Sequence, residues 1–364
     1  MKLFQCQNCG QVLYFENTAC LNCGYALGYL PGEDRMAAVE TDGPLWRAVG
    51  PTGQADAHAQ HWRFCRNWEH SACNWLVPAE DTQEADAYCV ACRHNRTVPD
   101  LSDPEYHAHW QRIESAKRRL IYTLMRLGLP RPLPGEGHPE PLVFDFLADD
   151  PDSAQRVMTG HAEGIVTISL AEADDAAREK MRSDMGEAYR TLLGHFRHEI
   201  GHYYWDILVR DGGALEAFRE MFGDEREEYG AALDRHYRDG PPAGWENSYV
   251  SAYATMHPWE DWAETWAHYL HMVDTLETAS ALRISIEPEM AGTGNLWAEI
   301  DFDPYNPRDA EMLISAWMPL TVALNTLNRS MGQRDLYPFS LPEQVQRKIG
   351  FVHDLVAGRR GGST

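Results

Sequence analysis

The sequence predicts an α+β fold in which an N-terminal cysteine-rich module precedes a mostly helical domain with a small β-sheet. All eight cysteines of the 364-residue chain lie before residue 93. Beyond about residue 100, apolar residues recur at helical spacing, and only two short apolar or β-branched runs indicate strands. We therefore expect three parts: the module at 1–95, a helix and Pro-rich linker at 96–140, and the helical domain at 141–364.

Composition and charge narrow the classes of function. Hydrophobic residues make up 44% of the chain, which is enough apolar material for packed cores and argues against disorder. The formal net charge of −23 repels phosphate backbones, so we do not expect nucleic acid as a partner. The sequence shows neither a secretion signal nor an apolar stretch of membrane-spanning length, so a cytoplasmic protein without a membrane partner is expected.

The cysteines form two sets of four with the spacing of metal ligands. The first set consists of two CxxC pairs: Cys6, Cys9, Cys20 and Cys23. The second set has one looser and one tight pair: Cys65, Cys73, Cys89 and Cys92. A CxxC turn directs two thiolates toward one ion, and this spacing favours zinc over redox pairs or buried free thiols. We expect two closed, structural zinc sites in a double zinc-ribbon module, with which the chain could dock a protein partner.

Capping and turn signals place the elements that follow. A capping box that begins at Ser102, with a proline near the first turn, predicts a helix to about Gly128. The stretch 129–141 is rich in proline and glycine and predicts a linker. Two short runs, at 142–147 and 164–170, predict strands.

Helical patterns fill most of the remaining chain. A long helix is predicted from about Asp174 to Val209, with a break allowed near Met185. An acidic, Tyr-rich helical stretch is predicted at 214–238. A further helix is predicted to start near Pro258, and helical pieces follow to the C-terminus.

The predicted long helix carries the motif His198-Glu199-Ile-Gly-His202. Residues four apart lie on one face of a helix, one turn apart, so the two imidazoles can bind one zinc ion. Glu199 is adjacent to them and can reach a water on that ion as a general base. The alternative is a helix face whose histidines are satisfied by other contacts. The strong apolar helix, the strand before it and the acidic helix after it favour the metal site.

A third ligand has to come from elsewhere in the chain. The residues after His202 do not continue the HExxHxxGxxH pattern of metzincins. A later predicted helix offers two carboxylates one turn apart, Glu260 and Glu264. We predict that Glu260 is the ligand and that Glu264 hydrogen-bonds the outer nitrogen of a ligand histidine. The reverse assignment stays open, as does a role for His268 or His271 as a third histidine.

This arrangement resembles a known class of peptidases. The motif HEIGH, then a tyrosine, six intervening residues and Glu-x-x-Ala-Glu, is similar to gluzincins of the anthrax lethal factor and Pro-Pro endopeptidase type. The resemblance implies that Glu260 binds the zinc and that Tyr253, seven residues before it, stabilises the oxyanion. The cysteine-rich front followed by HEIGHYYWD and HPWEDWAETWAHYLH resembles, over nearly the whole chain, a bacterial family of zinc-ribbon-containing zinc metallopeptidases.

Together these observations predict a zinc metallopeptidase, a hydrolase with one catalytic and two structural zinc ions and a peptide or protein substrate. Glu199 would take the proton of the attacking water, and Tyr253 would donate to the oxyanion. The strand at 165–170 would pair with extended substrate. The alternative is a regulatory zinc-binding adaptor or scaffold with narrow or no proteolytic activity, but a scaffold has no need of Glu199.

Overall fold

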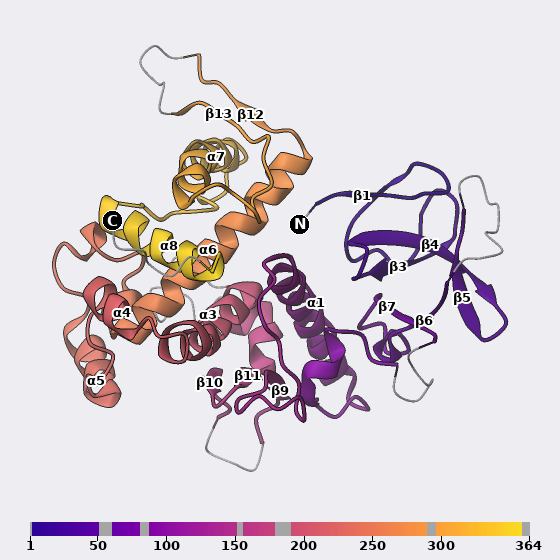
Figure 1. The fold of residues 1–364 in the computed structure, drawn as a ribbon, viewed down its shortest axis with the longest axis horizontal. Helices are drawn as coiled ribbons and strands as arrows, with labels where there is room; N and C mark the ends of the chain where they lie inside the picture. Colours follow the sequence, from indigo (N-terminus) through magenta and orange to yellow (C-terminus); the bar gives the residue numbers. More distant parts are fainter. Residues whose placement is uncertain are drawn as a thin grey trace. The chain divides into compact units, whose positions relative to one another are not determined.

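The computed structural model describes residues 2–50, 60–80, 87–150, 156–178, 191–289 and 296–358 (Figure 1). The chain folds into two compact units. The first comprises Met1–Tyr122, Arg131–Thr159 and Thr167–Asp174. The second comprises Thr123–Pro130, Gly160–Val166 and Asp175–Thr364. These two units are defined by compactness alone. The predicted domain boundaries at residues 95 and 140 therefore stay predictions.

Two antiparallel sheets build the N-terminal part of the first unit. β1 (Phe4–Gln5) and β2 (Val12–Leu13) form a short pair next to the first CxxC turn. The larger sheet has the strand order β3-β4-β5-β6-β7. Its strands are Ala26–Leu30, Arg35–Asp42, Leu45–Ala48, His61–Phe64 and Leu76–Pro78. This sheet is not predictable from the sequence pattern, because most residues of β3 and β4 are buried on both faces and lack the alternation that marks a strand.

Aromatic side chains pack the start of the chain against α1 (Pro104–Arg126). The rings of Phe15, Tyr29 and Trp75 lie 4.9–6.0 Å from one another between centroids. Tyr122 of α1 joins them with its ring 5.4 Å from that of Phe15. The helix confirms the predicted one, although the side chain of Asp103, one residue after Ser102, accepts the capping hydrogen bond from the Glu105 amide (2.8 Å).

A four-stranded sheet has the order β10-β11-β9-β8. Its strands are Gly160–Ala162, Ile165–Ser169, Val143–Leu147 and Asn95–Thr97, in that order. The strands predicted near 142–147 and 164–170 are therefore confirmed. The expectation that β11 pairs with extended substrate is wrong, because β10 and β9 occupy both of its edges and β10 is the edge strand.

Helices make up most of the second unit. α3 (Leu192–Tyr204) continues into a π-helical turn at Trp205–Arg210. After it come α4 (Leu215–Phe222), α5 (Tyr229–Asp239), α6 (Pro258–Ala281), α7 (Ala310–Ser330) and α8 (Glu343–Val356). β12 (Ser285–Ile286) and β13 (Ala298–Glu299) form a short antiparallel pair between α6 and α7. In the described part of the chain, no helix has both the length and the apolar character that a membrane crossing requires.

The predicted helices of this unit are confirmed in part. The long helix predicted from Asp174 is helical at 175–178 and again from Leu192, while its predicted break near Met185 lies outside the described residues. The predicted stretch at 214–238 is two helices, α4 and α5. Gly223, with a φ of 107°, ends the first of them in a backbone conformation that other residues rarely adopt.

In the second unit, α3 and α6 pack closely against each other. A Cβ atom on Gly201 would lie 3.1 Å from the Cα of Ala263 and 3.2 Å from the ring of Trp266. Trp262 donates its indole N–H to the carbonyl oxygen of Gly201 (2.8 Å). Tyr204 stacks on Trp266 with a centroid distance of 5.0 Å. A residue without a side chain at 201 therefore allows the two helices to approach to backbone contact.

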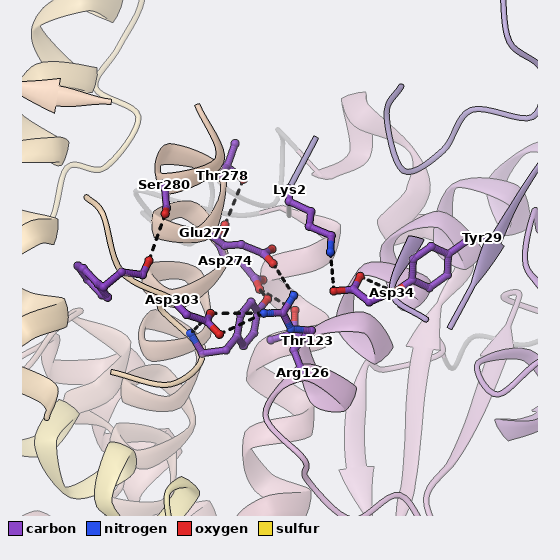
Figure 2. A network of polar contacts seen from close by, with 12 residues as sticks. Lys2, Tyr29, Asp34, Thr123, Arg126, Asp274, Glu277, Thr278, Ser280 and Asp303 are labelled. Carbon is purple, nitrogen blue, oxygen red and sulfur yellow. Dashed lines mark hydrogen bonds and ion pairs between the residues drawn. The ribbon is translucent and has the colours of Figure 1, made fainter. Parts of the chain in front are cut away.

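Buried polar contacts fix the same two helices further along. Asp274 of α6 accepts hydrogen bonds from the hydroxyls of Thr123 (2.7 Å) and Tyr305 (2.6 Å). It also pairs with Arg197 of α3, the residue before His198. Ion pairs of Arg126 with Glu277 (3.1 Å) and Asp303 (3.3 Å) lie beside these contacts (Figure 2). Buried hydrogen bonds and ion pairs of this kind restrain the helix that carries the HEIGH motif.

Candidate metal centre

The cysteines gather into the two predicted sets. Within each set the Sγ atoms lie within 4.8 Å of one another, and the sets are Cys6, Cys9, Cys20, Cys23 and Cys65, Cys73, Cys89, Cys92. The closest Sγ–Sγ distances are 3.6–3.7 Å. Thiolates on a tetrahedral zinc ion, each with a Zn–S bond of about 2.3 Å, lie about 3.8 Å apart. None of the eight cysteines is in a disulfide, so each set fits one zinc ion.

The second cysteine set is fully buried and has charged neighbours. Cys92 Sγ lies 3.6 Å from a carboxylate oxygen of Glu114, and Lys117 donates to the other oxygen (2.9 Å). Glu114 and Lys117 are both 0% exposed. Arg118, also buried, donates to the carbonyl oxygen of Ala72. The two cations of α1 offset the negative charge of buried thiolates, which would otherwise be costly to remove from water.

A third group of potential ligands lies in the second unit. His198, His202 and Glu260 each place a donor atom within 4.8 Å of the others. Nε2 of His198 is 3.0 Å from Oε2 of Glu260, and Nε2 of His202 is 3.5 Å from Oε1 of the same carboxylate. Two imidazoles and one carboxylate form a donor set typical of catalytic zinc. The residues therefore fit a zinc ion.

Local sequence explains how the two helices present these donors. His198 and His202 are one turn apart on α3, which the side chain of Thr191 caps by accepting from the Gly194 amide (3.0 Å). On α6, His257 caps the helix by accepting from the Trp259 amide (3.1 Å), and a proline follows the cap. Glu260 is therefore in the first turn of α6.

Glu264 contacts the opposite nitrogen of the first histidine. Its Oε1 is 2.7 Å from Nδ1 of His198, and its Oε2 accepts from the hydroxyl of Ser251 (2.6 Å). Burial lowers the pKa of His198, but hydrogen bonds to Glu260 and then to Glu264 outweigh it and raise that pKa well above its ordinary value. The two carboxylates thus favour a positive charge at this place. Sequence reasoning missed Ser251, because a lone serine in a loop gives no signal.

Two tyrosine side chains lie beside the donor group. The ring of Tyr253 has its centroid 6.1 Å from that of His198. Tyr229 donates its hydroxyl to Oε1 of Glu260 (2.9 Å). Burial, and then the charge of Glu260, raises the pKa of both tyrosines, so both hydroxyls are protonated donors. The charge of the half-buried Glu199 adds to the shift of the Tyr229 pKa. Sequence reasoning missed Tyr229, which lies 31 residues before Glu260 on another helix.

The two further histidines of α6 do not join the donor group. Nδ1 of His268 is 2.7 Å from the hydroxyl of Tyr337. The ring of His271 lies 5.6 Å from those of Trp317 and Tyr337. Burial lowers the pKa of His268 to about 4, so its imidazole is neutral in an aromatic core. The structure therefore gives no support to a third-histidine ligand.

Comparison with known proteins agrees with these donor sets. Residues 106–355 match the model of a family described as "Putative zinc-binding metallo-peptidase", and residues 3–103 match a zinc-ribbon domain. The chain therefore belongs to this zinc-binding metallopeptidase family. Relatives described as uncharacterized proteins occur in Mycobacterium bovis and in two strains of Mycobacterium tuberculosis. Each is 42% identical over 357 residues, covering 98% of this chain and 95% of the relative. No solved structure gives a significant match.

Proposed function

We propose that the chain is a zinc-dependent peptidase of the gluzincin type that hydrolyses peptide bonds. The observation that carries this proposal is the donor group of His198, His202 and Glu260, gathered within 4.8 Å in a chain that belongs to a zinc-binding metallopeptidase family. Glu199 stands next to the first histidine on the same helix, where a general base is required. The unpaired cysteines suit a reducing compartment, such as the cytoplasm.

The proposed roles follow from chemistry and position. A zinc ion in such a donor set supplies a Lewis acid that polarises a carbonyl group and lowers the pKa of water. The carboxylate of Glu199 takes the proton of the attacking water and returns it to the leaving amine. The protonated hydroxyl of Tyr253 donates to the oxyanion that develops on the carbonyl oxygen as the water adds to the carbonyl carbon. Glu264 fixes the orientation of the His198 ring through Nδ1.

The zinc-ribbon module is proposed to bind a protein partner. Three large side chains beside the first cysteine set are exposed to solvent: Val12 (49%), Tyr14 (61%) and Leu21 (95%). Apolar side chains exposed on so small a module are available for contact with a partner. The net charge of −23 favours a protein over nucleic acid as that partner.

Glu199→Gln is the direct test of the peptidase proposal. We expect the wild-type protein to cleave a denatured proteome, and the variant to lose about 10²–10⁴-fold in turnover, because an amide cannot take the proton of the water. Both proteins should hold the same amount of metal. New peptide ends identified by mass spectrometry measure the cleavage. Glu216→Gln, an exposed glutamate on α4, is the matched control. Equal cleavage by wild-type protein and Glu199→Gln would refute the proposal.

Metal analysis tests the proposed cofactors. The two cysteine sets and the His198 group lead us to expect three zinc ions per chain. His198→Ala should hold two, because the cysteine sites are separate from this residue. Inductively coupled plasma mass spectrometry on protein of known concentration gives the count. One zinc ion per wild-type chain would be incompatible with two zinc ribbons.

A further inference from the structure

The carboxylate of Glu260 has a third partner besides the two histidines. Tyr229, the first residue of α5, donates its hydroxyl to Oε1 (2.9 Å). That oxygen is the one that faces His202 (3.5 Å), while Oε2 faces His198 (3.0 Å). Each carboxylate oxygen of the buried Glu260 therefore has a defined partner.

The backbone on either side of this contact is tied together. Nε2 of His257 lies 3.1 Å from the carbonyl oxygen of Glu227, two residues before Tyr229. His257 is also the residue that caps α6. Glu228 caps α5 by accepting from the amide of Gly230 (3.0 Å). The residue two before α5 is thus joined to the cap of α6, and the first turns of these helices carry the Tyr229 hydroxyl and the Glu260 carboxylate.

Aromatic contacts hold the ring of Tyr229 in place. Its centroid lies 5.4 Å from that of His257 and 6.4 Å from that of Trp259, and Trp259 in turn lies 4.0 Å from His202. The rings of Tyr229, His257 and Trp259, with that of Trp205, line a cavity of about 290 Å³. Tyr229 is 38% exposed, and its contacts with His257 and Trp259 are made by the ring, so removal of the hydroxyl alone leaves the packing of this wall intact.

We propose that Tyr229 is a positioning residue of the metal centre, which holds the carboxylate of Glu260 in the orientation that a metal ion requires. The proposal rests on the metal site named under the proposed function. A carboxylate that can rotate freely must be ordered each time a metal binds, and a hydrogen-bond donor on one oxygen removes that cost. α5 then contributes to the centre although it provides no ligand.

Tyr229→Phe tests this role, because it keeps the ring and removes only the hydroxyl. We expect zinc affinity at the His198 group to fall about 10–100-fold, the usual effect of losing a contact to a ligand. Competition with chelators of graded affinity measures it, with the cysteine sites still loaded. Cobalt substitution gives a second readout, since the d–d absorption reports the geometry around the metal. Tyr237→Phe is the matched control on the same helix, 61% exposed.

The outcomes separate this role from the metal site itself. If His198→Ala binds as much metal as wild-type protein, no metal is bound at the His198 group. The metal site and the role of Tyr229 then both fail. If wild-type protein binds that metal and Tyr229→Phe binds it equally tightly with the same cobalt spectrum, only the role of Tyr229 fails. Unchanged circular dichroism and melting of the variant would show that a loss of affinity is not a loss of fold.

Discussion

Glu260→Ala is expected to remove the metal from the His198 group and to abolish turnover at the same time. Glu260 is the carboxylate that faces both histidines, and it is only 2% exposed. Without it two imidazoles are left, which is too few ligands for tight binding of zinc. Glu264→Ala removes the same side chain one turn later on α6. That variant loses an orienting hydrogen bond to His198, and we expect about 10–100-fold weaker binding or activity.

A chelator titration of both variants, alongside activity on any cleaved peptide, ranks the two glutamates. The opposite order, with Glu264→Ala metal-free and Glu260→Ala still tightly loaded, would invert their roles. Tyr253 would then stand eleven residues before the ligand, and its proposed oxyanion role would fall with the assignment. The proposed role of Tyr229 would fall too, because its hydroxyl contacts Glu260.

Deletion of residues 1–95 is expected to abolish cooperative folding. The sequence alone predicts a folded remainder, because the cysteines end before the linker. The contacts of α1 favour the opposite result. Trp110 and Tyr122 are each 1% exposed, and their rings contact His70 (5.9 Å) and Phe15 (5.4 Å) of the deleted part. Exposing each such side chain costs about 1.5–3 kcal/mol, against a total domain stability of about 5–15 kcal/mol.

Thermal melting followed by circular dichroism, with size-exclusion chromatography, tests this expectation. Residues 96–364 should aggregate or melt without a sharp transition. Co-expression with 1–95 as a separate chain is the control, since it restores the contacts of α1 without the covalent link. A sharp, reversible melt of 96–364 alone would show that the module is an independent attachment.

The parts of the site that the sequence predicts are those with short spacing. Two CxxC turns, or two histidines four residues apart, fix the relative position of their side chains through local backbone geometry alone. Pro258 after a capping residue likewise predicts where α6 begins, and hence that Glu260 lies in its first turn. The pairing of Glu260 with His198 and His202, which the structure also brings together, rests on the resemblance to gluzincins and not on spacing.

Contacts between distant segments gave no such signal. Tyr229 reaches Glu260 from another helix, and Ser251 reaches Glu264 from a loop. The sheet β3-β4-β5-β6-β7 was not predicted for a related reason. Its central strands are covered on both faces by distant parts of the chain, so their sequences do not alternate between apolar and polar residues. Such features depend on tertiary packing, which a periodic pattern in one segment does not contain.

Gly201, the fourth residue of the HEIGH motif, meets a packing constraint that the pattern HExxH does not specify. Written HExxH, the motif treats that position as free, and chance helices satisfy it easily. Here the smallest residue is favoured, because a Cβ would lie 3.1 Å from the backbone of α6 at Ala263, closer than an ordinary van der Waals contact. A search with the pattern HExGH would therefore select for a crossing helix at backbone distance as well as for ligands, and would exclude many chance helices that lack such a partner.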